Sequence, residues 1–168
     1  MTVTVRTAEP RDADALVALA SAIAGEPEGW LLSDARWRSV AAERRYVRAL
    51  RRHPDAGLFL ATVGDTIVGR LSITRDAHPS SAHVADIGLM VAASHRRQGV
   101  ATLLMGVAEE WAGFASVTKL ELHVFPHNSP AIALYEKLGY LEEGVRRRHY
   151  RRPDGTYADA ILMAKALA

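Results

Sequence analysis

Apolar and polar residues follow two different periods along this chain, and these periods predict its helices and strands. Residues 2–6 alternate with the period of two that is typical of a strand. Residues 10–25 predict a helix that begins at a proline, because apolar residues then recur at helical spacing until a glycine. A second helix is predicted over residues 33–53, opened by Ser33 or Asp34.

Paired strands are predicted after this second helix. Residues 58–63 and 66–74 are two strand-like runs joined at Gly64 and Asp65, which is a hairpin signal. Residues 83–91 form a further apolar run that predicts the next strand. The centre of the chain therefore favours a β-sheet.

The remaining segments alternate helices with strands. A long helix is predicted over residues 99–114, with an apolar side that runs from Leu103 to Phe114. Further predicted elements are a strand over residues 119–125, a helix between Pro130 and Gly139, and strands around residues 140–146 and 157–164. The order predicts a single α/β domain over residues 1–168, in which helices pack on a mixed sheet. Strand, helix and strand over residues 83–125 can form a right-handed crossover unit.

Composition narrows the possible classes of protein. The chain is 49% hydrophobic and 24% charged, it has no cysteine, and no apolar run approaches the roughly 20 residues of a membrane span. The missing cysteines exclude a disulfide framework, a thiolate metal site and a cysteine nucleophile. The first residues lack the layout of a signal peptide. We therefore expect a cytoplasmic protein with no metal site and no membrane association.

Positive charge is clustered although the net charge is only +2. This small excess does not indicate nucleic-acid binding. The arginines of residues 36–52 are interpreted as a solvated helix face, and no nucleic-acid motif accompanies them. Two further clusters are Arg96 with Arg97, and residues 146–148.

The loop before the 99–114 helix is a candidate anion site. Helix N-termini carry unpaired N–H groups and a positive dipole end. Gly99 and Ala101 allow close approach to the main chain, Arg96 and Arg97 add charge, and Thr102 adds a hydroxyl donor. A diphosphate suits this loop. The alternative is a polar strand-to-helix turn with two solvated arginines, since a short glycine-bearing loop is a weak signal.

Two spaced motifs carry a resemblance to a known family. Arg96-x-x-Gly99-x-Ala101 resembles the Arg/Gln-x-x-Gly-x-Gly/Ala pyrophosphate loop of the GNAT superfamily of N-acetyltransferases. The superfamily's second cofactor motif is similar to Asn128-x-x-Ala131-x-x-Leu134-Tyr135-x-x-Leu138-Gly139-Tyr140. The motifs occur in the right order, and the resemblance covers nearly the whole chain. Residues 83–88 and Glu143-Gly144 further resemble the bacterial YhhY-like group, which is associated with N-acetylation of amino acids or similar small amines.

The resemblance implies a fold, a cosubstrate and a reaction. The expected GNAT fold is a mixed, mostly antiparallel sheet of about seven strands with helices on both faces and two central strands splayed to hold the cofactor. Acetyl-CoA is the expected acetyl donor, a small-molecule amine the acceptor, and a homodimer the assembly. The cofactor-binding residues implied are Met90, Val91, Arg96, Arg97, Gln98, Gly99, Val100, Ala101, Thr102, Asn128, Ala131 and Tyr135.

Specific roles follow for some of these residues. A backbone N–H near Met90 or Val91 is expected to polarise the thioester carbonyl. Tyr135 is expected to act as general acid, because the thiolate that leaves must be protonated and a phenol can supply the proton. Asn128 either binds the pantetheine or caps the helix opened by Pro130.

The general base is less well defined by the sequence. Relatives carry a glutamate on the strand before the pyrophosphate loop, where this chain has an alanine followed by Asp86. Strict alternation turns Asp86 to the opposite face, although a bulge can redirect it. His83, Glu121 and His123 are the other candidates, through direct contact or through water.

The sequence leaves alternatives open for the acceptor and for the activity. Aromatic residues that could line an acceptor pocket are equally consistent with a core or a dimer face; they are Trp30, Trp37, Tyr46, His149, Tyr150 and Tyr157. The alternative acceptor is a protein N-terminus or lysine. A different class of function is a non-catalytic acyl-CoA-binding sensor.

Overall fold

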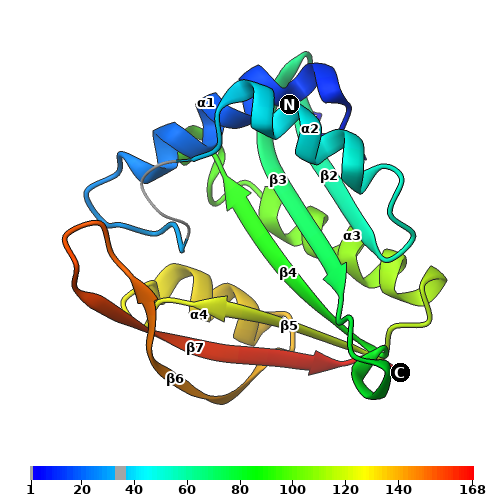
Figure 1. Cartoon of the computed structure of the whole chain (residues 1–168), viewed down its shortest axis with the longest axis vertical. Coiled ribbons are helices and arrows are strands. Elements are labelled where there is room, and N and C mark those ends of the chain that lie inside the picture. The colour runs from blue at the N-terminus through cyan, green and yellow to red at the C-terminus, as the bar shows by residue number, and fades with distance from the viewer. Residues whose placement is uncertain (1, 33–36) are drawn as a thin grey trace.

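The computed structural model describes residues 2–32 and 37–168, and within them one seven-stranded sheet carries helices on both faces (Figure 1). The helices are α1 (Ala13–Ala24), α2 (Val40–Leu50), α3 (Val100–Phe114) and α4 (Ser129–Lys137). The strands are β1 (Thr4–Thr7), β2 (Ala56–Val63), β3 (Thr66–Arg75), β4 (Val84–Val91), β5 (Lys119–Val124), β6 (Leu141–Arg151) and β7 (Tyr157–Ala166). Their order in the sheet is β1-β2-β3-β4-β5-β7-β6. The β4–β5 pair is parallel and the other pairs are antiparallel, which confirms the predicted mixed sheet.

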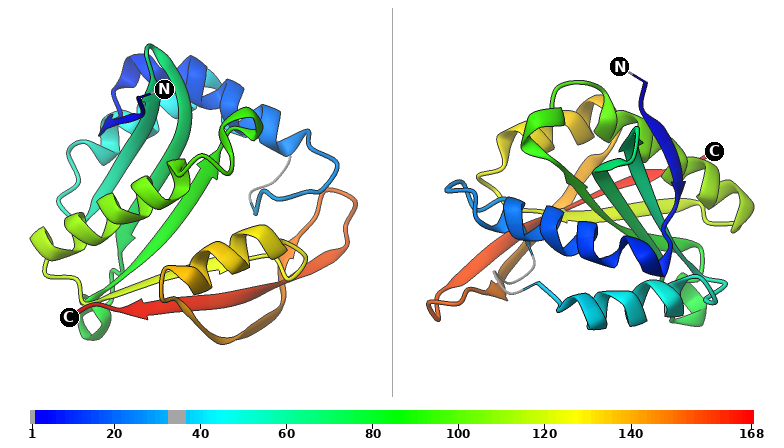
Figure 2. Two further views of the ribbon diagram at one scale, coloured as in Figure 1. Left: turned by 180° about the vertical axis from the view of Figure 1, so that it is seen from behind. Right: turned by 90° about the horizontal axis from the view of Figure 1, so that it is seen from above.

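The two faces of the sheet are covered by different helices, as the view from above shows (Figure 2). Leu58 of β2 packs with Leu16 of α1 and Val47 of α2 on one face. Leu71 of β3 packs with Leu104 of α3 on the other face. This division follows from the alternation of side chains along each strand.

Two central strands separate along their length and open the sheet. β4 and β5 are paired from Val84–Lys119 to Asp86–Glu121, and the pairing stops there. Residues 87–91 of β4 therefore have no partner on β5, and Figure 1 shows the two strands diverging from one end. The splay expected between central strands is present.

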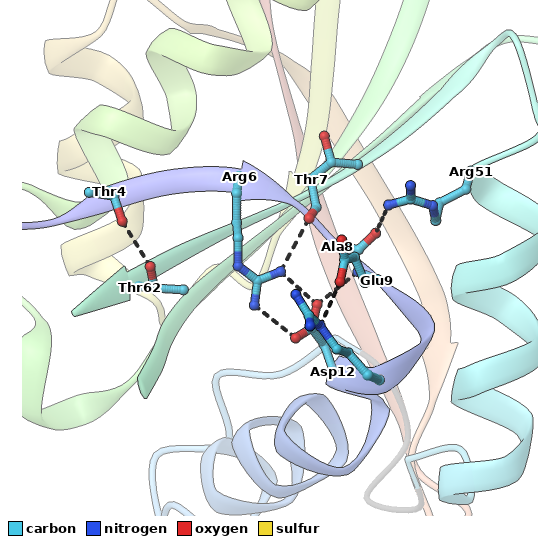
Figure 3. Close-up of polar contacts among 9 residues, drawn as sticks. Thr4, Arg6, Thr7, Ala8, Glu9, Asp12, Arg51 and Thr62 are labelled. Atoms are coloured by element: carbon cyan, nitrogen blue, oxygen red, sulfur yellow. Dashed lines mark hydrogen bonds and ion pairs between the residues drawn. The ribbon is translucent and has the colours of Figure 1, made fainter. Parts of the chain in front are cut away.

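The N-terminal segment is fixed to the sheet and to α1 by polar contacts (Figure 3). The guanidinium of Arg6 donates two hydrogen bonds of 2.7 and 2.8 Å to the carboxylate of Asp12, which also accepts from the Glu9 N–H at 2.7 Å. Arg51, the C-cap residue of α2, donates to the carbonyl of Ala8 at 2.9 Å. These contacts hold the start of α1 near the C-terminal end of α2.

Two details of the helices differ from the prediction. α2 begins at Val40, where the Ser39 hydroxyl caps the helix by accepting from the Ala42 N–H at 3.2 Å. The start expected at Ser33 or Asp34 is therefore wrong for the helix, and both residues lie outside the described part of the chain.

The predicted apolar side of α3 is also partly wrong. Phe114 is 93% exposed and Leu103 is 42% exposed. The buried side of the helix is instead formed by Val100, Leu104, Met105, Ala108 and Ala112.

No helix among the described residues is both long and apolar enough to cross a membrane.

Candidate functional site

A groove of about 630 Å³ opens where β4 ends and α3 and α4 begin. Its walls contain every cofactor-binding residue that the resemblance implied except Gln98. The Gln98 side chain is exposed and donates to the Ser94 carbonyl at 3.0 Å. The lining residues that come from these segments are Met90, Val91, Arg96, Arg97, Gly99, Val100, Ala101, Thr102, Asn128, Ala131 and Tyr135.

One wall of the groove is the N-terminus of α3. Gly99 adopts a left-handed conformation, with φ of 83°, and its carbonyl accepts the first hydrogen bond of the helix from Leu103. The N–H groups of residues 100–102 consequently have no partner within the helix. Together with the helix dipole they favour an anion at this point. The nearby Arg97 side chain is exposed and adds positive charge.

The Arg96 side chain is engaged within the protein. Its two terminal nitrogens each donate to the Glu26 carboxylate at 2.7 Å, and its Nε donates to the Val91 carbonyl at 3.1 Å. Glu26 follows the end of α1. Arg96 therefore joins the end of β4 to the loop after α1, and this fork geometry is the strong form of an arginine–carboxylate contact.

The free edge of β4 offers main-chain groups to the gap between the splayed strands. The Ala92 N–H bonds to Val68 on β3, and the His83 carbonyl accepts from β5. Because hydrogen-bonding groups alternate along a strand, Leu89 and Val91 direct their N–H groups into the gap. Met90 directs its N–H toward β3, and its side chain lines the groove. Of the two N–H groups named from the sequence, that of Val91 thus faces the gap.

Leu89 was not among the residues predicted for the site. The group that it offers to the gap is its main-chain N–H, so its side chain gives no signal in the sequence. The register of β4 against β3 supplies the missing information.

The third wall of the groove is α4. The Asn128 side-chain oxygen accepts from the Ala131 N–H at 3.3 Å, so the capping interpretation is correct for the oxygen. Its amide NH₂ can still donate to a ligand. Tyr135 is 7% exposed and lies 6.0 Å from the Tyr140 ring, between centroids. Burial raises the pKa of Tyr135 to about 12, and its hydroxyl makes no hydrogen bond with the described residues.

The two acid–base candidates on the β4 segment lie at different distances from the groove. Asp86 lies at the point where β4 and β5 separate, on the same face as Met90. Its side chain is exposed, yet desolvation by the surrounding protein, with the charge of Glu121, raises the pKa of Asp86 to about 6 against an opposing effect of Arg146. His83 lies in the exposed turn before β4, eight residues and roughly 25 Å from Val91.

A polar and aromatic cluster covers the same face beside Asp86. The His123 Nδ1 and the Tyr150 hydroxyl are 2.8 Å apart, and the His149 ring is 5.2 Å from that of His123. Burial lowers the pKa of His123, and the nearby charges of Arg146 and His149 lower it further. The structure thus brings His149 and Tyr150 together with β5.

The other aromatic residues predicted for the acceptor pocket lie at three different places. Tyr157 is 50% exposed and packs under Arg148. Trp37 and Tyr46 stack around Arg38, 4.9 and 4.0 Å from its guanidinium carbon. Trp30 lines the groove.

Comparisons with known proteins identify the family and the fold. The L-amino acid N-acetyltransferase AaaT of Escherichia coli is 32% identical over 171 residues, which cover 97% of each chain. A GNAT-family acetyltransferase from Streptococcus pneumoniae has a similar structure, with a TM-score of 0.87, 26% identity and coverage of 99% of this chain and 100% of that one. YncA of Salmonella typhimurium, whose structure contains acetyl-CoA, has the same fold at 15% identity, with a TM-score of 0.85 over 100% of this chain and 95% of that one. Residues 24–140 match the model of the Acetyltransferase (GNAT) family, and the chain therefore belongs to this family of N-acetyltransferases.

Proposed function

We propose that this enzyme transfers the acetyl group of acetyl-CoA to the amine of an L-amino acid or a similarly small amine, by direct attack in a ternary complex. The observation that carries the proposal is the splay of β4 and β5, which begins beside Asp86 and opens toward the groove at the N-terminus of α3. Similarity to AaaT over 97% of both chains supports an amino-acid acceptor.

The groove fits acetyl-CoA in size and in polarity. Its volume of about 630 Å³ lies within the range usual for small-molecule sites. The N–H groups of residues 100–102 and the Arg97 side chain would hold the diphosphate. The unpaired edge of β4 at Leu89 and Val91 would pair with the amides of the pantetheine arm, and the Asn128 amide would add a donor.

Two groups would act on the thioester, through which acetyl-CoA supplies an activated acetyl group. A main-chain N–H at Leu89 or Val91 would donate to the carbonyl oxygen as negative charge develops on it. Tyr135 would donate its proton to the sulfur as the carbon–sulfur bond breaks. Its raised pKa keeps this phenol protonated at neutral and mildly alkaline pH.

The acceptor would bind on the face that carries Asp86. With a pKa of about 6, the Asp86 carboxyl is ionised at neutral pH and can take a proton from the ammonium group, directly or through water. Arg146 supplies a positive charge on the same face, and its effect on the pKa of both Asp86 and His123 indicates that it lies near them. One negative and one positive group complement the two charges of a free amino acid.

The proposal is tested by thiol release from acetyl-CoA with a panel of amines. The panel contains L-amino acids, their D-isomers, their decarboxylated amines, polyamines, aminoglycosides and short peptides. We expect the highest kcat/KM with an L-amino acid. No acceleration by any L-amino acid would overturn the proposal. A preference for peptides would support the alternative protein acceptor, and acetyl-CoA binding without turnover on any amine would support a sensor.

A further inference from the structure

A short segment after α1 lies beside the groove at the open side of the sheet. This segment, residues 26–31, is called the strap here. Figures 1 and 2 show it between the end of α1 and the β6–β7 hairpin. Trp30 and Leu31 of the strap line the groove. The strap is therefore part of the wall around the site where the pantetheine arm would lie.

One end of the strap is attached to the loop that follows β4. The Glu26 carboxylate accepts a hydrogen bond from each terminal nitrogen of Arg96, and the Arg96 Nε also donates to the Val91 carbonyl. The two side chains are 17% and 33% exposed, so the pair is only partly accessible to water. Three of the five N–H groups of the guanidinium are consequently used to connect the strap to β4.

The other end of the strap is attached to the segment that follows β5. The His127 Nε2 lies 2.8 Å from the Glu28 carbonyl, so this nitrogen donates to it. The His127 ring is stacked between Trp30 and Phe125, at centroid distances of 5.7 and 5.5 Å. The strap thus connects the segments that follow β4 and β5, at the end of the gap that lies farthest from the paired residues of the two strands.

We propose that Arg96 is a positioning residue, which holds the strap across the mouth of the groove and thereby keeps the pantetheine part of acetyl-CoA in place. In this arrangement Arg97, which is exposed and makes no ion pair with the described residues, supplies the charge for the diphosphate. The inference rests on the proposed function only in that acetyl-CoA occupies the groove. Arg96 would then act on the pantetheine part of the donor, and the adjacent Arg97 on its diphosphate.

The direction in which Glu26→Gln changes the affinity for CoA distinguishes this role from direct phosphate binding. If Arg96 were a diphosphate ligand, Glu26 would compete with the phosphates, and Glu26→Gln would strengthen CoA binding. If Arg96 fastens the strap, Glu26→Gln releases the strap and weakens binding. We expect the dissociation constant of CoA to rise by about tenfold, as for the loss of a partly buried charge pair.

A truncated ligand locates the effect within the donor. Pantetheine has the arm of CoA without the diphosphate and the nucleotide. We expect Arg96→Gln and Glu26→Gln to weaken CoA and pantetheine by the same factor of about ten. Arg97→Gln is the matched control, and it should weaken CoA while leaving pantetheine unchanged. Arg96→Lys should not restore binding, because an ammonium keeps the charge but cannot replace the fork.

Binding is measured by calorimetry without an acceptor, so the result does not depend on which amine is acetylated. Circular dichroism and thermal unfolding of each variant verify the fold. The inference would be overturned if Arg96→Gln weakened the binding of CoA but not that of pantetheine, or if Glu26→Gln bound CoA more tightly. Lack of turnover with L-amino acids in the panel above would contradict the proposed acceptor and leave this binding comparison intact.

Discussion

Tyr135→Phe removes one oxygen atom from the floor of the groove and tests the proposed proton donor. The ring is 7% exposed and packs beside Tyr140, so phenylalanine can occupy the same space. The hydroxyl bonds to none of the described residues, so its removal leaves no protein partner there unpaired. We therefore expect the fold and the shape of the groove to persist.

The pKa of Tyr135 indicates when its proton moves, and the usual contribution of general acid catalysis gives the expected loss of rate. The rise of this pKa from 10 to about 12 corresponds to roughly 3 kcal/mol against the phenolate. A free thiol titrates near 8.5, so complete proton transfer to a thiolate with that pKa would be uphill by about 5 kcal/mol. Burial of the leaving sulfur within the groove would raise the thiol pKa as well, which would narrow this difference. The proton is therefore expected to move as the carbon–sulfur bond breaks, and loss of the acid should lower kcat about 100-fold.

The assay compares two kinds of donor. Thiol release at saturating acetyl-CoA and acceptor gives kcat, and calorimetry gives the dissociation constant of CoA, which we expect to change by less than about threefold. An acetyl thioester of an acidic aromatic thiol needs no proton on its leaving group, so its turnover should be far less sensitive to Tyr135→Phe. An unchanged kcat with acetyl-CoA would refute the acid role. An equal loss with both donors would show that the hydroxyl acts in some other way.

Three further predictions concern the acceptor face and the N-terminal segment. kcat/KM should rise with pH through about 6 as Asp86 loses its proton, and a pH–rate profile of Asp86→Asn should lack this limb. Arg146→Gln should raise KM for an L-amino acid about tenfold and leave KM for the decarboxylated amine unchanged, in parallel steady-state assays. Hydrogen bonds from Arg6 and the Glu9 N–H lower the pKa of Asp12, so its stabilisation is present above the unfolded carboxyl pKa near 3.9 and is lost as pH falls through the lower folded pKa. Asp12→Asn should therefore reduce the free energy of unfolding by about 1–2 kcal/mol at pH 7, measured by denaturant titration. In the variant, the free energy of unfolding should also change less with pH in the acid range.

The donor half of the site could be predicted because each part of it is local in sequence. Gly99 sits beside the helix start that it creates, and Asn128 and Tyr135 share one helix or its cap. The spacing within each motif therefore fixes the geometry. Helix boundaries were less secure, since Ser33, Asp34 and Ser39 are all good capping residues and only tertiary packing selects among them.

The strap and the face around Asp86 depend on contacts between residues that are distant in sequence. Glu26 and Arg96 are 70 positions apart, and sequence spacing gives no reason to pair them. Arg146 acts on Asp86 and His123 although β7 lies between β5 and β6 in the sheet, and β6 is irregular between Arg146 and Tyr150, so spacing along the chain does not predict this proximity. The predicted homodimer and the role of His83 stay predictions, because no contact within the single chain bears on them.

The choice between Met90 and Val91 shows why a motif can locate a site without assigning its donor. Both residues line the groove, but their N–H groups leave opposite edges of β4. The antiparallel partner β3 occupies the edge used by Met90, and the early end of pairing with β5 frees the edge used by Val91 and Leu89. A shift of one residue in the β3–β4 register would exchange these roles without changing any residue of the motif. Strand register and the splay therefore determine which N–H is available as the proposed donor to the thioester, and side-chain identity at these positions acts mainly through packing.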